Sequence, residues 1–425
     1  MSTAATEKLA LLGGPRAVPE EDEDLFRWPI VTEEDEAAVL EVLRAGGMSG
    51  TNITRLLEAE YAAYQGARYA LGYCNGTAAL LGAMYGCGIR RGDEIICPSL
   101  TYWASALPAF NLGATAVFAD IEPDSLCLDP RDIEHRITPR TKAIMVVHYC
   151  GHPADMDPIM TIARKHGLKV IEDVSHAHGA LYKGRLVGAI GDVSAMSLMS
   201  GKSLPAGELG MLCTDDQLIY ERAIAFGHYE RTGELTLPEV TPFAGMPLGG
   251  YKHRAHQLSS AMARVQLRAY PARMAEIQRA MNSFWDQLEG LPGFRAHRPA
   301  KGSGSTMGGW YNPLGHYRPE ELGGLPIDKF AETVNAEGGR TGRASNFPMH
   351  LHPVLNTADV YGDGKPTRIA FADRDLRQER GTLPVSEALA DRCLGIPWFK
   401  HLRPKQIGQY AQAFRKVATQ ADKLR

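Results

Sequence analysis

The chain has 425 residues and a formal net charge of −3, and 44% of its residues are hydrophobic and 22% charged. This length suggests two or three domains with a large buried core, and the near-neutral charge excludes a strong electrostatic footprint for nucleic acid or a membrane surface. No apolar run approaches the roughly 20 residues of a membrane-spanning helix, and the N-terminus lacks a secretion-signal layout. The seven cysteines have no Cys-x-x-Cys spacing, so we expect a cytoplasmic protein with reduced thiols.

The first half of the chain alternates between helical and strand patterns. After a loop-like stretch over residues 1–30, Thr32 begins an amphipathic helix that stops at Gly46, and a second helix is expected over residues 53–64. Strand, helix and strand in repetition then predict an α/β fold with a mostly parallel sheet sandwiched by helices. The strands are expected at residues 67–73, 94–97, 115–119, 143–149, 169–172, 193–198 and 211–213, and the helices between them at 77–86, 103–112 and 157–166.

The pattern changes after one long helix, which is expected from Ala255 to about Leu288 and could bend at Pro271. A region rich in glycine and proline follows over residues 291–326, and a smaller α+β pattern continues to Arg425. We therefore predict two domains. Residues 1–285 form a large α/β domain with an N-terminal extension, and residues 286–425 form a small α+β C-terminal domain.

One lysine stands among small and apolar residues in the segment 196–210, Met-Ser-Leu-Met-Ser-Gly-Lys-Ser-Leu-Pro-Ala-Gly-Glu-Leu-Gly. Partial burial would lower the pKa of Lys202 and leave more of its amine free to attack a carbonyl. Taken alone, the segment is more typical of a surface lysine in a turn. Its meaning therefore depends on the groups elsewhere in the chain.

Polar side chains follow the ends of several predicted strands, which is where ligands bind in open parallel sheets. Gly76 and Thr77 open a helix and could bind phosphate, and Tyr102 could form a platform for a flat ring. Asp173 ends a buried strand and could keep a heterocyclic nitrogen protonated, and Ser197 offers a second phosphate ligand. Each feature also has an ordinary structural explanation: a turn, core packing, a solvated strand end, or a serine bonded to its own backbone.

In combination these groups are more specific than any one of them. A phosphate turn, an aromatic platform, a carboxylate and a lysine are the set that binds pyridoxal 5'-phosphate. Two His-x-His spacings, His176 with His178 and His350 with His352, lack an evident third ligand, so no metal site is expected.

The chain resembles the fold type I pyridoxal-phosphate aminotransferases of the DegT–StrS type, which act on nucleotide-linked keto-sugars and keto-cyclitols and include aminohydroxybenzoate synthase. The resemblance extends from Leu12-Gly13-Gly14 to Ile396-Pro397-Trp398, which is nearly the whole chain. It rests most on Cys74-Asn-Gly-Thr-Ala-Ala-Leu80, Pro98-Ser-Leu-Thr-Tyr-Trp103, Glu172-Asp-Val-Ser-His-Ala-His-Gly179 and Ser197-Leu-Met-Ser-Gly-Lys202.

This resemblance implies roles for the cofactor-binding residues. Lys202 would carry the cofactor as a Schiff base, and Asp173 would pair with the pyridine nitrogen. Tyr102 would stack on the ring and His176 would lie near the ring hydroxyl. Gly76, Thr77 and Ser197 would hold the phosphate.

The chain departs from the family pattern in two segments. Lys252 stands where many members have an asparagine that reaches the phosphate of a neighbouring subunit, and a cation can serve there as a point charge. We therefore expect at least a homodimer with shared active sites. Gly207-Glu208-Leu209-Gly210 replaces the common Gly-Glu-Gly-Gly, so the loop beside the substrate is expected to differ in shape.

The resemblance implies an aminotransferase that moves an amino group from glutamate or glutamine to a keto-sugar or keto-cyclitol with ping-pong kinetics. The expected substrate-facing residues are Ser49, Glu208, His228, His350 and His352. One alternative is a dehydrating or aromatising enzyme of the same family, although the retained Lys202 counts against the dehydratase branch. Another is a non-catalytic regulator on this scaffold. The acceptor stays open among nucleotide-linked sugar, free sugar and cyclitol.

Overall fold

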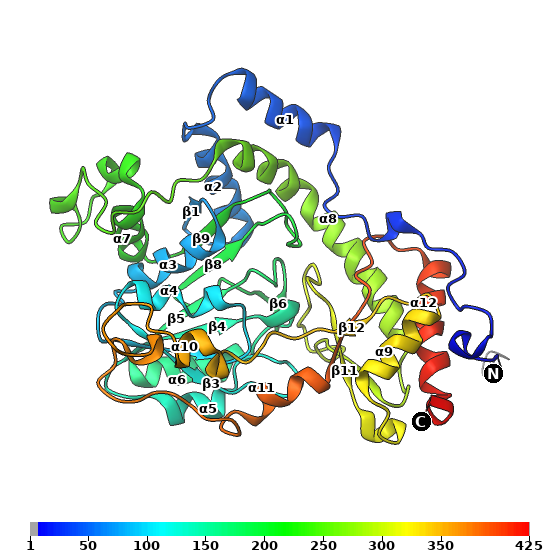
Figure 1. Ribbon diagram of the computed structural model, residues 1–425. Helices are drawn as coiled ribbons and strands as arrows, with labels where there is room; N and C mark the ends of the chain where they lie inside the picture. The colour runs from blue at the N-terminus through cyan, green and yellow to red at the C-terminus, as the bar shows by residue number, and fades with distance from the viewer. Residues whose placement is uncertain (1–6, 425) are drawn as a thin grey trace.

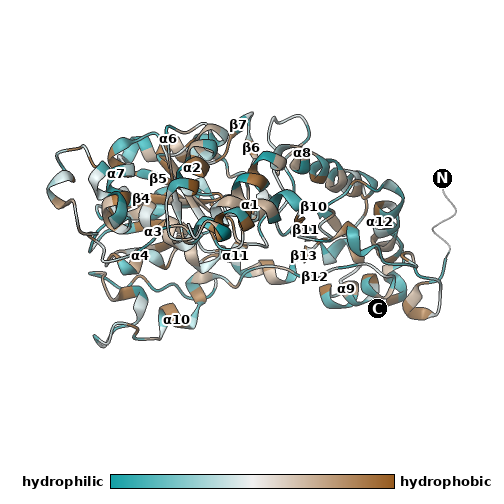
Figure 2. Ribbon diagram, turned by 90° about the horizontal axis from the view of Figure 1, so that it is seen from above, coloured by the Kyte–Doolittle hydropathy of each residue, from teal (hydrophilic) through white to brown (hydrophobic). Residues whose placement is uncertain are grey.

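The computed structural model describes residues 7–424. A large lobe contains a seven-stranded sheet and a small lobe a four-stranded sheet, and α8 (Gln257–Gln287) runs from the first lobe to the second (Figure 1). Seen from above, α8 lies between the large lobe and α12 (Pro404–Ala418) (Figure 2). The predicted long helix is confirmed, and it continues through Pro271.

The large sheet has the strand order β1-β9-β8-β5-β4-β2-β3. All neighbours pair in parallel except β9, which is antiparallel to both β1 and β8. Its strands are almost entirely buried, which explains their continuous apolar runs. The predicted mostly parallel sheet is confirmed. The strands are β1 (Tyr69–Tyr73), β2 (Glu94–Pro98), β3 (Thr115–Ala119), β4 (Thr141–Val147), β5 (Lys169–Asp173), β8 (Val193–Ser197) and β9 (Gly210–Thr214).

Helices flank this sheet, and most lie where the sequence predicts them. They are α1 (Glu33–Arg44), α2 (Asn52–Gln65), α3 (Gly76–Gly86), α4 (Pro108–Asn111), α5 (Pro130–Arg136), α6 (Met156–His166) and α7 (Gln217–Gly227). The helix predicted over residues 103–112 is wrong in extent: a short 3₁₀ turn, Trp103–Ser105, precedes α4. Pro108 is the reason, because it has no N–H to continue a helix and instead begins a new one. A two-stranded ribbon of β6 (Leu181–Tyr182) and β7 (Arg185–Leu186) follows β5.

The small lobe is built on an antiparallel sheet in the order β10-β11-β13-β12. Its elements are β10 (Phe294–Ala296), β11 (Leu314–Tyr317), β12 (Gly342–Arg343), β13 (Cys393–Gly395), α9 (Ile327–Ala336) and α12. Its apolar core includes Leu9, Val18 and Leu25 from the N-terminal segment, which lies beside the small lobe in Figure 1. Conversely, Met349 and Leu383, which come late in the chain, pack in the apolar core of the large lobe. The chain therefore crosses between the lobes more than once, and the predicted division at residue 285 stays a prediction.

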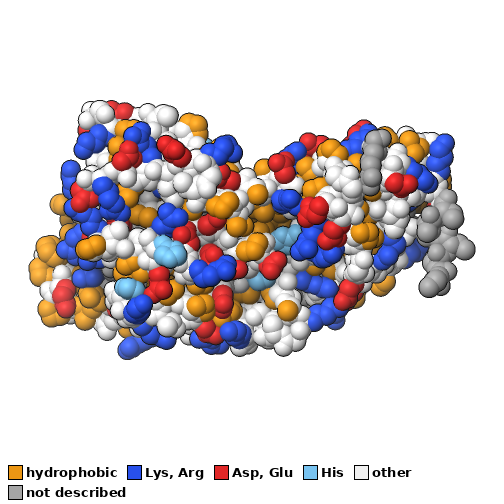
Figure 3. Space-filling view, turned by 90° about the horizontal axis from the view of Figure 1, so that it is seen from below, with side chains coloured by type: hydrophobic (Ala, Val, Ile, Leu, Met, Phe, Trp, Pro, Cys, Tyr) orange, Lys and Arg blue, Asp and Glu red, His pale blue; other side chains and the backbone are white. Residues whose placement is uncertain are grey.

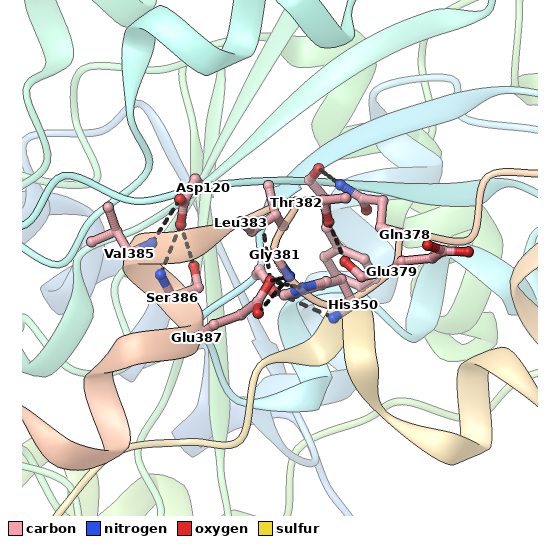
Figure 4. A network of polar contacts seen from close by, with 12 residues as sticks. Asp120, His350, Gln378, Glu379, Gly381, Thr382, Leu383, Val385, Ser386 and Glu387 are labelled. Carbon is pink, nitrogen blue, oxygen red and sulfur yellow. Dashed lines mark hydrogen bonds and ion pairs between the residues drawn. The ribbon is translucent and has the colours of Figure 1, made fainter.

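A buried polar network ties the segment 378–388, which contains α11 (Pro384–Ala388), to the large sheet (Figure 4). Asp120, directly after β3, accepts hydrogen bonds from the backbone N–H groups of Val385 and Ser386 at 3.0 and 2.9 Å. Glu387 accepts from Gly381 N–H at 2.8 Å and bonds to His350 at 3.0 Å. A short helix, α10 (Pro353–Asn356), lies just after His350. The network fixes this late segment against the carboxyl ends of the strands.

The surface carries both charge signs. On the face seen from below, acidic and basic side chains are interspersed (Figure 3), in keeping with the small net charge. Within residues 7–424, no helix has both the length and the apolar character needed to cross a membrane. All seven cysteines are free thiols, as predicted.

Candidate active site

A cavity of about 320 Å³ opens at the carboxyl ends of the parallel strands. The turns after β1 and β2 and the ends of β5 and β8 all reach it. The structure thus brings together side chains that are up to 271 positions apart, from Asn75 to Asn346. Of the predicted site residues, its lining contains Gly76, Thr77, Tyr102, Asp173, His176, Ser197, Lys202 and Glu208.

The N-terminus of α3 forms one end of this cavity. Asn75 caps the helix, because its side-chain oxygen accepts a hydrogen bond from Ala78 N–H at 2.8 Å. A Cβ atom added to Gly76 would lie 2.6 Å from Cβ of Ser197, so only glycine permits this approach of helix and strand. The N–H groups of the first turn and the Ser197 hydroxyl therefore lie close together, which is the arrangement that binds a phosphate.

Asp173 supplies a fixed carboxylate at the end of β5 and is only 5% exposed. Ser105 Oγ donates a hydrogen bond to its Oδ2 at 2.7 Å, and the Ser175 N–H donates to its Oδ1 at 3.0 Å. Thr101 and Ser105 share a further bond of 2.8 Å between their hydroxyls. Both oxygens are therefore oriented, and the carboxylate can face a cationic N–H in the cavity.

The neighbouring acid, Glu172, has a structural role on the other face of the strand. It is fully buried and accepts from the N–H groups of Gly188 and Gly191, and it bonds to His148 at 3.0 Å. Although burial raises the pKa of Glu172, these hydrogen bonds outweigh it and hold the pKa below its usual value. Of these two acids, only Asp173 lines the cavity.

His176 is held as a neutral ring. The Cys150 N–H donates to its Nδ1 at 3.3 Å, which assigns the ring proton to Nε2. Burial, and then the charge of Lys202, lower the pKa of His176 well below its usual value. The imidazole can therefore donate a hydrogen bond from Nε2 to an oxygen atom of a ligand.

Lys202 is buried in the cavity wall and only 8% exposed. Burial lowers the pKa of its amine to about 8, although the nearby Asp173 and Cys150 act in the opposite direction. Its backbone carbonyl accepts a hydrogen bond from Trp28 Nε1 at 2.9 Å. An amine with this pKa is partly neutral at physiological pH and can act as a nucleophile or a base.

The remaining predicted residues lie at the rim or away from the cavity. Tyr102 is 48% exposed at its edge, Glu208 is exposed on the rim, and His352 lines an adjacent apolar hollow that also includes Tyr102. Ser49 and Lys252 are exposed and do not line this cavity.

Two predicted substrate-facing histidines have structural partners instead. His228 is buried and donates from Nε2 to the Gly72 carbonyl at 2.9 Å. His350 is fully buried, with its two ring nitrogens bonded to Ser99 at 2.6 Å and to Glu387 at 3.0 Å (Figure 4). Neither lines the cavity, so this placement does not support direct contact with a substrate.

Several lining residues escaped the reasoning from sequence. They are Thr101, Ser105, Ser175, Tyr311, Asn312 and Asn346. Ser175 lies two positions after Asp173, so a search for hydroxyls near that carboxylate could have found it. Ser105 is 68 positions from Asp173, and no local pattern links the two. Tyr311, Asn312 and Asn346 come from beyond residue 300, where no pattern links them to the strand ends.

Comparison with known proteins identifies the chain. The sequence profile of the DegT/DnrJ/EryC1/StrS aminotransferase family matches residues 29–415. The chain belongs to this family. Among its relatives is the L-glutamine:scyllo-inosose aminotransferase of Streptomyces griseus, which is 33% identical over 96% of this chain and 97% of that protein.

Solved structures agree. The aminotransferase from Psychrobacter cryohalolentis is 29% identical, with a TM-score of 0.78 over 92% of this chain and 98% of that one. DesV of S. venezuelae, solved in complex with a ketimine intermediate, is 31% identical, with a TM-score of 0.74 over 91% of this chain and 94% of that one. The predicted fold type I architecture is confirmed.

The protein is therefore a pyridoxal-phosphate-dependent aminotransferase. The residues in the cavity fit this cofactor. The Gly76 approach leaves space for a phosphate, Asp173 is oriented by two donors, and Lys202 is a desolvated amine. The individual roles of these residues remain predictions.

Proposed function

We propose that this aminotransferase takes an amino group from glutamine or glutamate and transfers it to a keto-cyclitol. The observation that carries the proposal is the charge of the cavity. Among the described residues, Lys202 is the one lysine or arginine that lines it or the adjacent hollow. A pyrophosphate of a nucleotide-linked sugar needs cations, whereas a keto-cyclitol is uncharged. The Streptomyces griseus relative is named for such an acceptor, scyllo-inosose.

The residues of the chain divide the work. When bound, pyridoxal 5'-phosphate supplies an aldehyde that takes the amino group from the donor and passes it to the acceptor carbonyl. Asp173, oriented by Ser105 and Ser175, would accept a hydrogen bond from the pyridine N–H and keep the proton there. His176, whose Nδ1 accepts a hydrogen bond from the Cys150 N–H, would donate a hydrogen bond from Nε2 to the ring oxygen. Lys202 Nζ would take a proton from the donor Cα and deliver it to the carbon that carried the aldehyde, and would move a proton in the reverse direction for the acceptor.

We also infer that the active unit is a homodimer with shared sites. Lys252 is exposed and its Nζ lies 5.6 Å from the ring centroid of Tyr229. Phe243 and Met246, in the same connection between α7 and α8, are exposed as well. An exposed apolar surface beside a cation suits a second copy of the chain, whose cofactor phosphate Lys252 would reach. The free thiols suit action in the cytoplasm.

A panel of acceptors tests the reaction. The purified protein, loaded with pyridoxal 5'-phosphate, is incubated with ¹⁵N-amide and ¹⁵N-amine glutamine and with scyllo-inosose, a free keto-hexose or a nucleoside-diphosphate keto-hexose. We expect ¹⁵N in an amino-cyclitol by mass spectrometry. Transfer to the nucleotide-linked sugar alone would contradict the keto-cyclitol proposal, and water loss without net amino transfer would favour a dehydrating enzyme.

A further inference from the structure

The amine of Lys202 lies against the face of an aromatic ring. Its Nζ is 4.1 Å from the ring centroid of Tyr311, well inside the distance of about 6 Å at which a ring attracts a cation. Asp173 influences the amine as a nearby charge, and its oxygens accept hydrogen bonds from Ser105 and Ser175. The ring of Tyr311 is a direct contact of the amine.

Tyr311 stands in a strained piece of backbone. Its neighbours Trp310 and Asn312 have φ values of 56° and 49°, in the left-handed region that residues other than glycine rarely adopt. Such conformations cost free energy and persist only where the surroundings enforce them, and they gather at functional sites. Here the two left-handed residues flank Tyr311, whose side chain lines the cavity.

The surrounding packing enforces this loop. A Cβ atom on Gly309 would lie 2.3 Å from Cβ of Ser203, so the loop touches the residue that follows Lys202. Trp398 Nε1 donates to the Gly309 carbonyl at 3.1 Å, and its ring meets Tyr311 edge-on at 6.0 Å. The loop therefore has little freedom to move away from the lysine.

The other side of Tyr311 faces His176, with ring centroids 4.7 Å apart. The titratable groups around the amine are Asp173, Cys150, His176 and His178. Burial lowers the pKa of both histidines and raises the pKa of the Cys150 thiol to about 12. Of these groups, Asp173 and then Cys150 favour a charged amine, as does the ring of Tyr311.

We propose that Tyr311 is a positioning residue for Lys202 that acts whenever the amine is not bonded to the cofactor. Its ring face holds the protonated Nζ inside the cavity until the lysine returns its proton. This inference rests on the aminotransferase assignment and deepens it, because the free lysine is the group that moves the proton. The hydroxyl of Tyr311 is not required for the effect.

Matched variants separate the ring from the hydroxyl. Tyr311→Phe keeps the ring and Tyr311→Leu removes it while keeping apolar bulk. The protein is loaded with pyridoxamine 5'-phosphate, so that Lys202 is free, and its reaction with a trace of acetic anhydride is followed by mass spectrometry across pH. We expect Tyr311→Leu to lower the pKa of Lys202 by about one unit, because the cation loses its ring. Tyr311→Phe should match the wild type.

Steady-state kinetics give a second readout. Tyr311→Leu should lower kcat about tenfold with little change in KM for the amino donor, and Tyr311→Phe should restore it. If the leucine variant does not fold, mono-, di- and trifluorophenylalanine at position 311 keep the shape and weaken the ring's attraction stepwise, so the pKa of Lys202 should fall stepwise as well.

Equal pKa values and kcat in all variants would overturn the proposal, as would a phenylalanine variant as impaired as the leucine variant. The labelling measurement uses no acceptor. It therefore fails or succeeds independently of the keto-cyclitol assignment.

Discussion

At the scale of single residues, the chemistry of each polar group depends on its exposure to water and on its hydrogen-bond partners. Lys202 is buried away from water, and this burial lowers the pKa of its amine to about 8. Asp173 is given two hydrogen-bond donors, one on each oxygen. His176 keeps its proton on Nε2 because Nδ1 already accepts one bond. Burial and hydrogen bonding thus account for the orientation of Asp173 and His176 and for the lowered pKa of Lys202.

The lysine's lowered pKa predicts how cofactor loading depends on pH. Only the neutral amine attacks an aldehyde, so the rate at which the apoenzyme turns yellow with pyridoxal 5'-phosphate should rise about tenfold per pH unit below pH 8 and level off above it. An ordinary lysine would place this inflection near pH 10.4, about the value for free Nα-acetyl-lysine amide as the control. Stopped-flow absorbance measures this rate between pH 6 and about pH 11, and an inflection above pH 10 for the protein would contradict the burial argument.

Sequence motifs can reveal Lys202 and Asp173 because each lies in a short local pattern at a strand end. Ser105 and Tyr311 could not be assigned in this way. The contact of Ser105 with Asp173 spans 68 positions, and that of Tyr311 with Lys202 arises from the strained loop of a different lobe. His350 shows a second limit of sequence reasoning. The sequence does not reveal that its ring nitrogens bond to Ser99 and Glu387, and its role at the substrate stays a prediction.

At the scale of elements, the site is made by strand ends and helix starts meeting closely. The sequence predicts the seven strands of the large sheet within a few residues, since buried parallel strands give continuous apolar runs. It does not predict that β9 runs antiparallel between β1 and β8, because strand order depends on long-range pairing. The close approach of α3 to β8 at Gly76 depends on this order.

Gly76→Ala tests that approach. The added methyl would lie 2.6 Å from Cβ of Ser197, so the phosphate turn must shift. We expect the affinity for pyridoxal 5'-phosphate to fall about 5- to 150-fold, the effect of about 1–3 kcal/mol of overpacking. Gly342→Ala is the matched control, because its Cβ would meet nothing within 4 Å. Fluorescence titration measures both, and equal affinities would show that the turn is not the phosphate site.

At the scale of the whole molecule, both lobes contribute residues to the cavity. The large sheet supplies the strand-end groups, and the segment from residue 309 to 312 brings Tyr311 to them. The N-terminal segment packs in the core of the small lobe and also reaches the site, since Trp28 Nε1 bonds to the Lys202 carbonyl. The contact between the N-terminal segment and the site could not be predicted, because residues 1–30 have no periodic pattern of apolar residues.

The shared-site homodimer predicts complementation between inactive variants. Lys202→Ala removes the reactive amine, and Lys252→Ala removes the cation proposed to serve the neighbouring subunit. If the two are refolded together at equal amounts, half of the dimers are mixed and each mixed dimer has one intact site, so about a quarter of wild-type activity should return. Activity that stays at the level of the separate variants would contradict a shared site.

The most direct test of the account is the visible spectrum of the wild type and of Lys202→Ala, each with pyridoxal 5'-phosphate and then with glutamine or glutamate. We predict that the wild type is yellow and that the donor bleaches this band. The variant should lack the band that the lysine forms with the cofactor. A Lys202→Ala protein that shows the same band and the same response to donor would contradict the assignment of Lys202, and with it the proposed chemistry of the site.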